Sequence, residues 1–227
     1  MKIRGIASIV ALLLLAACQP GLVTAEVEQT TAEVDRFSVF VEAVRIYKLD
    51  YEPASSPADL ASRADLVVRG AIVGVEPGQA YAPVPGSPAR IVTSVLHVAV
   101  SKVLAGDPDL VWNGMAYVEI PHPARLYAGE EDPQGRLYDL AAFAALVPKT
   151  EGVFFLDDRT KEPYWETIVD PGAGRPEGAP LMVSYAQGLL LADPGGRLVS
   201  VLVELDSMPS PWRAISTIDE VVAALTG

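Results

Sequence analysis

Apolar and polar residues alternate along several stretches of the chain, a pattern typical of half-buried β-strands. Residues 65–75 form one such stretch, and Gly70 and Gly74 within it indicate bulges or strong curvature. Residues 90–103 carry apolar side chains on both faces, so we expect a central strand there. Shorter apolar segments predict further strands at 116–120, 152–157, 165–169, 185–192 and 197–205.

Helix and turn signals separate these strands. Ser56 and Pro57 suit the cap and the first position of a short helix ending near residue 64. Thr217 and Glu220 have the spacing of a capping box, which predicts a terminal helix. The remaining signals predict a short helix at 138–146, a hairpin turn at 193–196, and proline-rich loops at 76–88 and 170–180.

The segment before the first of these elements is less regular. Residues 19–35 are rich in Thr, Glu and Ala without aromatics, which is typical of a flexible tether. Residues 36–50 fit the period of a strand and also that of a helix, and their β-branched and aromatic residues favour a first strand. The alternating set is Phe37, Val39, Val41 and Ala43, and the helical set is Phe37, Phe40, Val41, Val44 and Ile46.

The number and spacing of the strands predict a mainly β fold. Few connections hold a crossover helix, which argues against a parallel α/β sheet. The pattern is closer to a closed or partly closed small β-barrel with short flanking helices.

The first residues of the chain have the organisation of a signal peptide. Lys2 and Arg4 supply positive charge, and residues 6–16 form an uncharged apolar run. A transmembrane helix needs roughly 20 apolar residues, so this run is too short to span a bilayer. No later apolar stretch approaches that length, so we expect no transmembrane helix.

The segment Leu15-Ala16-Ala17-Cys18 resembles the lipobox of bacterial lipoproteins. The resemblance implies lipidation of the Cys18 thiol, cleavage before Cys18 and acylation of the new amino terminus. Two or three acyl chains anchor a protein stably in a bilayer. The alternative is a secreted protein with a chance cysteine near its cleavage site. Gln19, which is not Asp, resembles the pattern of lipoproteins sent to the outer membrane if the cell is Gram-negative.

Three further segments carry a second resemblance. Residues 60–70, 95–106 and 153–156 are similar to the strand motifs ADLVVxG, VxxVLxG and G-apolar-FL of many uncharacterised exported bacterial proteins. The resemblance implies an OB-like barrel, similar to netrin-like domains, and implies no activity. We therefore expect a signal peptide at 1–17, a lipidated cysteine and tether at 18–50, and a single β-rich domain with a C-terminal helix at 51–227.

The charge and the cysteine content of the chain limit the kinds of molecule that it is expected to bind. The 29 acidic and 17 basic residues give a net charge of -12, which argues against binding to nucleic acid. Cys18 is the single cysteine, so no disulfide forms within the chain. The expected partners are the bilayer, through acylated Cys18, and an envelope protein or small ligand.

The sequence has few signs of catalysis. It holds no Gly-x-Ser-x-Gly motif, Gly-rich phosphate loop or dinucleotide fingerprint, so no cofactor is expected. His122 lies between two prolines and near carboxylates, which are residue types that bind zinc. This candidate metal set is His122, Glu119, Glu130, Glu131 and Asp132, and a solvated loop is the alternative.

Aromatic residues beside loops suggest a binding surface. Tyr164, Trp165 and Trp212 are candidates for an exposed patch, with a role in the core as the alternative. The sequence thus predicts an envelope lipoprotein whose body acts as a binding or structural module. The alternative is a metal-assisted envelope hydrolase that uses His122 and nearby carboxylates.

Overall fold

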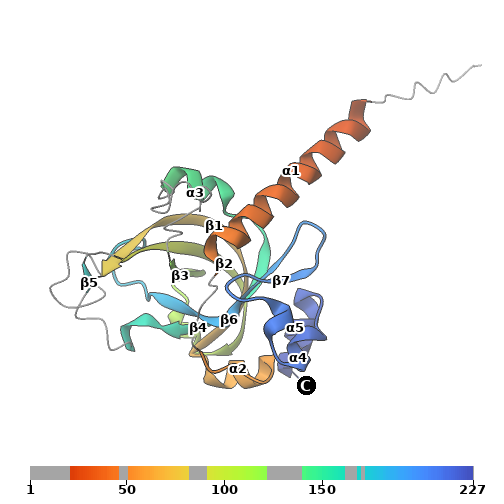
Figure 1. Cartoon of the computed structure of the whole chain (residues 1–227). Helices are drawn as coiled ribbons and strands as arrows, with labels where there is room; N and C mark the ends of the chain where they lie inside the picture. The colour runs from red at the N-terminus through yellow and green to blue at the C-terminus, as the bar shows by residue number, and fades with distance from the viewer. Residues whose placement is uncertain are drawn as a thin grey trace, which may run out of the picture.

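The structure is a computed structural model of the whole chain (Figure 1). It describes residues 21–45, 51–81, 91–121, 140–161, 168–169 and 172–226. Cys18, His122, Glu130, Glu131, Asp132, Tyr164 and Trp165 lie outside the described residues.

The described part of the chain is mainly β, with one seven-stranded sheet and several helices around it. The strands are β1 (Leu66–Tyr81), β2 (Ile91–Gly106), β3 (Met115–Pro121), β4 (Glu151–Asp158), β5 (Ile168–Val169), β6 (Met182–Ala192) and β7 (Leu198–Ser200). The helices are α1 (Gly21–Val44), α2 (Pro57–Arg63), α3 (Leu140–Leu146), α4 (Ser210–Arg213) and α5 (Ile218–Thr226), and short 3-10 turns are η1 (Pro108–Leu110), η2 (Arg159–Lys161) and η4 (Leu205–Ser207).

Strand pairing connects sequence-distant segments. The order in the sheet is β2-β3-β6-β4-β1-β5, β7 pairs with β6, and β1 also pairs with β2. The pairs are antiparallel except β3 with β6, which is parallel. Strand β1 pairs with β2 along its length, with β4 through residues 66–71 and with β5 through residues 80–81. Its register with β2 shifts at several positions, including those beside Gly70 and Gly74. The bulges predicted at these two glycines are confirmed.

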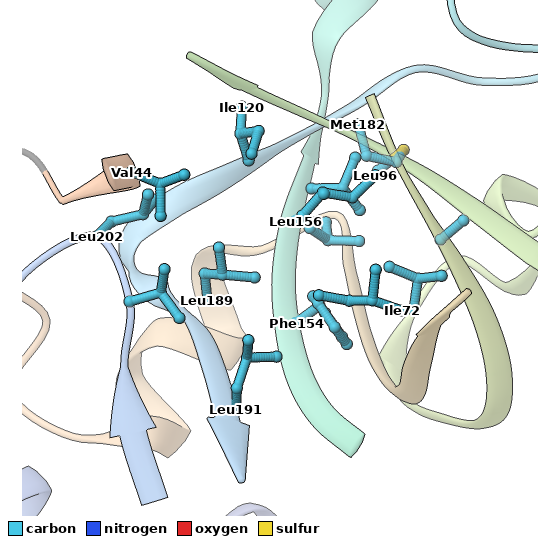
Figure 2. Packing of buried hydrophobic residues seen from close by; sticks show 14 of the residues in the cluster. Val44, Ile72, Leu96, Ile120, Phe154, Leu156, Met182, Leu189, Leu191 and Leu202 are labelled. Atoms are coloured by element: carbon cyan, nitrogen blue, oxygen red, sulfur yellow. The ribbon is translucent and has the colours of Figure 1, made fainter. Parts of the chain in front are cut away.

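One apolar cluster covers one face of the sheet. Figure 2 shows side chains from β1, β2, β3, β4 and β6 that point toward one another. All are buried, as alternation along each strand requires when one face is covered. Members labelled in the figure include Ile72, Leu96, Ile120, Phe154, Leu156, Met182, Leu189 and Leu191.

The tether and first strand expected before residue 50 are replaced by a helix over residues 21–44. Phe37, Phe40, Val41 and Val44 follow helical spacing and are buried in the same apolar cluster. Phe40 stacks on Phe143 of α3, with ring centroids 6.0 Å apart. A strand would place Val39 beside Phe37 and Val41, yet Val39 is 39% exposed. Residues 36–44 therefore form a helix and not a strand, because helical spacing buries Phe37 and Phe40 and leaves Val39 exposed.

A second apolar cluster lies on the opposite face of β1, β4 and β6. Helices α2, α4 and α5 cover this face, as Figure 1 shows below and beside the sheet. The predicted helix starts are confirmed: Ser56 accepts a hydrogen bond from the Asp59 amide, and Thr217 accepts one from the Glu220 amide. The cluster holds Leu60, Val67, Val153, Phe155, Leu190, Trp212, Ile218 and Val221.

Several predicted boundaries change. The loop expected from residue 76 begins later, because β1 continues to Tyr81 through its pairing with β2. The strand expected over 197–205 ends at Ser200, and the chain then turns into η4. The hairpin turn at 193–196 is confirmed between β6 and β7, where Gly196 has a φ of 80°.

Candidate functional site

Two grooves flank helix α1 where it lies on the body of the protein. The first, the α1–β7 groove, has a volume of about 510 Å³. The second, the α1–α3 groove, has a volume of about 570 Å³. Both volumes lie in the range of small-molecule sites. Phe37 and Pro194 line both grooves, so the grooves meet along the helix.

The lining of each groove comes from α1 and from segments far away in the sequence. The α1–β7 groove is lined by Val34, Phe37, Ser38, Val41, Glu42, Arg45, Asp193, Pro194, Gly195, Arg197 and Val199. The α1–α3 groove is lined by Glu33, Arg36, Phe37, Ala144, Ala145, Val147, Pro148, Lys149, Thr150 and Pro194.

The cations of the α1–β7 groove are paired. The Arg45 guanidinium lies 3.3 Å from a Glu204 carboxylate oxygen and donates to the Ser200 carbonyl. The Arg197 guanidinium lies 2.7 Å from a carboxylate oxygen of Asp193. Burial raises the pKa of Asp193, but hydrogen bonds from the backbone and side chain of Arg197 outweigh it and hold that pKa below its usual range. These cations are thus already engaged by the protein.

The cations of the α1–α3 groove, in contrast, form no ion pair with a described residue. Arg36, on α1, and Lys149, between α3 and β4, are both exposed. Neither forms an ion pair with another residue in the part of the chain that the structure describes. Glu33 is the acidic residue of this lining, so the groove carries more positive than negative charge.

A buried polar cluster lies on β3, away from these grooves. A carboxylate oxygen of Glu119 accepts a hydrogen bond from Nε of Arg159 at 2.9 Å, and both side chains are buried. The other Glu119 oxygen lies 2.8 Å from the Thr93 hydroxyl. Burial lowers the pKa of Arg175, and the Glu119 carboxylate opposes that shift. Glu119 is therefore already held by neighbouring polar groups.

The structure describes only one of the five residues of the predicted metal site. Glu119 lies on β3 and is hydrogen-bonded to Arg159 and Thr93, while the other four members lie outside the described residues. Among described residues, no group of three or more His, Cys, Asp or Glu side chains could hold a metal ion. The metal site stays a prediction, and the metal content of the purified chain, compared with His122→Ala, tests it.

The predicted aromatic patch is wrong at Trp212. This side chain is 0% exposed, and its indole N–H donates to the Ala54 carbonyl at 2.9 Å. It also meets Phe155 edge to face. Pro209 precedes α4 and Pro211 lies in its first turn, so this segment is a short helix and not an open loop. Tyr164 and Trp165 lie outside the described residues.

His97, on β2, is held by a hydrogen bond. Its Nε2 lies 3.0 Å from the Gly174 carbonyl, and its ring meets Tyr117 edge to face. This contact fixes the segment after residue 172 against β2. The histidine therefore has a structural role in the described part of the chain.

Sequence reasoning missed both grooves and the two cations Arg36 and Lys149. The helical stripe of residues 37, 40, 41 and 44 was the available signal for α1. No local signal links Arg36 with Lys149, because they converge only after α1 docks beside α3.

Among the described residues, no helix is both long and apolar enough to cross a bilayer. Comparison of the chain with protein-family models, curated proteins and solved structures finds no match.

Proposed function

We propose that the chain is a bacterial envelope lipoprotein whose β-rich body acts as a binding module. The observation that carries this proposal is the segment Leu15-Ala16-Ala17-Cys18 after an uncharged apolar run. The anchor is acylated Cys18, and the body stands on the exported side of the membrane. If the cell is Gram-negative, Gln19 favours the outer membrane.

Helix α1 is long enough to separate the body of the protein from the bilayer. It begins at Gly21, three residues after Cys18, and has 24 residues. At a rise of 1.5 Å per residue, that helix is about 36 Å long. Its C-terminal half is packed on the body, and its N-terminal half extends away from the sheet (Figure 1). An arm of this kind holds the body away from the bilayer, which suits a chain with a net charge of -12.

We further propose that the sheet is an OB-like barrel. Pairing runs from β1 through β2, β3, β6 and β4 and returns to β1. The parallel pair of β3 with β6 and the position of α3 between β3 and β4 also support this fold. Nuclear Overhauser contacts between Val118 and Met182 would be expected from the parallel pair, and their absence would count against it.

The anchor is tested by labelling growing cells with an alkyne-bearing palmitate. The wild-type chain is expected to carry label and to migrate as the processed form. Cys18→Ser removes the thiol that accepts the lipid, so label is expected to disappear and the precursor to accumulate. Ser38→Ala, a variant in α1, is a control that should be labelled normally. Normal processing and labelling of Cys18→Ser would refute the proposed anchor.

A further inference from the structure

The α1–α3 groove combines two features that are not found together in the neighbouring groove. Part of its lining is apolar, and this part, the floor, consists of Phe37, Ala144, Val147, Pro148 and Pro194. At its rim, Arg36 and Lys149 are exposed cations with no ion pair among the described residues. The α1–β7 groove lacks this second feature, because Arg45 and Arg197 are paired with Glu204 and Asp193.

Charge and size together define what such a groove can hold. An anion is attracted by Arg36 and Lys149, and Arg can present two parallel N–H donors to one anionic head. An apolar body gains free energy by covering the floor of the groove. The volume of about 570 Å³ suits a small molecule. Glu33, on α1 one turn before Phe37, opposes an anion but is outnumbered by the two cations.

We propose that the α1–α3 groove binds a small amphipathic anion, with its head between Arg36 and Lys149 and its apolar body on the floor. This inference names the ligand class of the binding module and so rests on the proposed function. The head is placed by one residue from α1 and one from the α3–β4 connection. Binding therefore bridges α1 to the body and favours the docked position of the helix.

The test uses the full chain in nanodiscs of neutral phosphatidylcholine. The probe is dodecanoate bearing a photoreactive diazirine on its chain, and the matched probe is the corresponding dodecanol, which has no charge. After illumination, mass spectrometry of peptides locates the label. We expect dodecanoate to label peptides that contain Phe37 and residues 144–148, and dodecanol to label them much less. Equal labelling by the two probes, or dodecanoate label confined to other peptides, would overturn the proposal.

Two variants test the roles of the rim and the floor. The double variant Arg36→Gln, Lys149→Gln removes both exposed cations without removing a core side chain. We expect its labelling by dodecanoate to weaken about fivefold, from two contacts of the strength of partly exposed ion pairs. The control Lys102→Gln, Arg213→Gln also removes two exposed cations, away from the groove, and should leave labelling unchanged. Ala144→Trp should block labelling by filling the groove.

The outcomes separate this inference from the proposed anchor. Unchanged dodecanoate labelling in the double variant or in Ala144→Trp would refute the groove site even if Cys18 is lipidated. A fall in labelling in the Lys102→Gln, Arg213→Gln control equal to that of the Arg36→Gln, Lys149→Gln variant would also refute it, since net charge alone would then explain the effect. Groove labelling that persists in Cys18→Ser would leave the groove site supported whatever the fate of the anchor.

Discussion

Replacement of Phe40 by Ala tests whether α1 is held on the body as described. Phe40 is fully buried, packs in the central apolar cluster and stacks on Phe143. Among the side chains of α1 that the structure describes, the buried apolar ones are Phe40, Phe37, Val41 and Val44. Burial of each contributes about 1.5–3 kcal/mol, which is an upper estimate because unfolded chains already bury some surface. Phe→Ala in a core costs about 3–5 kcal/mol, so this change removes a large part of the docking free energy.

The assay is hydrogen–deuterium exchange of the backbone amides of residues 37–45, followed by urea unfolding. A loss of 3 kcal/mol corresponds to opening that is about a hundredfold more frequent, so these amides should exchange at least that much faster. Val39→Ala changes an exposed side chain on the same helix and should alter stability by less than about 0.5 kcal/mol. Equal exchange in Phe40→Ala and Val39→Ala would show that α1 is not docked through Phe40.

Three further changes probe other contacts. Glu119→Gln removes the buried carboxylate beside Arg159 and should lower the free energy of unfolding in urea by about 3–5 kcal/mol; a loss near that of an exposed ion pair would contradict the buried cluster. Asp193 has a lowered pKa in the folded protein, so its stabilisation is present above the unfolded pKa and is lost as the pH falls through the folded one. Urea unfolding should show a gap between wild type and Asp193→Asn at neutral pH that shrinks below about pH 4, and a pH-independent gap would be inconsistent with this. Trp212→Phe removes the indole N–H that donates to the Ala54 carbonyl, which keeps Gln187 Nε2 as a second donor, and should cost about 0.5–1.5 kcal/mol in the same assay; no cost would contradict the hydrogen bond from Trp212.

The strands were the most predictable part of the fold. Each long strand has one face in the central cluster, so apolar residues recur at every second position of its sequence, as in β1 and β2. Periodicity could not decide residues 36–44, because the same apolar side chains fit a strand and a helix. The contact of Phe40 with Phe143 decides for the helix, and this contact joins segments that are far apart in the sequence.

The candidate sites were less predictable for a related reason. Trp212 follows two prolines and looks like a loop residue, but it lies on the short helix α4 and is buried against Phe155. The α1–α3 groove needs Arg36 and Lys149 to converge, and neither has a distinctive sequence context. A local pattern records the face that a segment buries, but it does not record which segment covers that face.

The parallel pair of β3 with β6 also governs how the chain reaches this structure. Val118 pairs with Met182, and Leu66 of β1 pairs with Leu156 of β4, so most of the chain must be synthesised before these contacts form. Proteins dominated by such non-local contacts fold slowly, because loop-closure entropy is lost before the contacts compensate. Until β6 arrives, β3 and β4 each expose an unpaired edge that can recruit another chain. The interval before β6 joins the sheet is therefore when the polypeptide is most prone to aggregation.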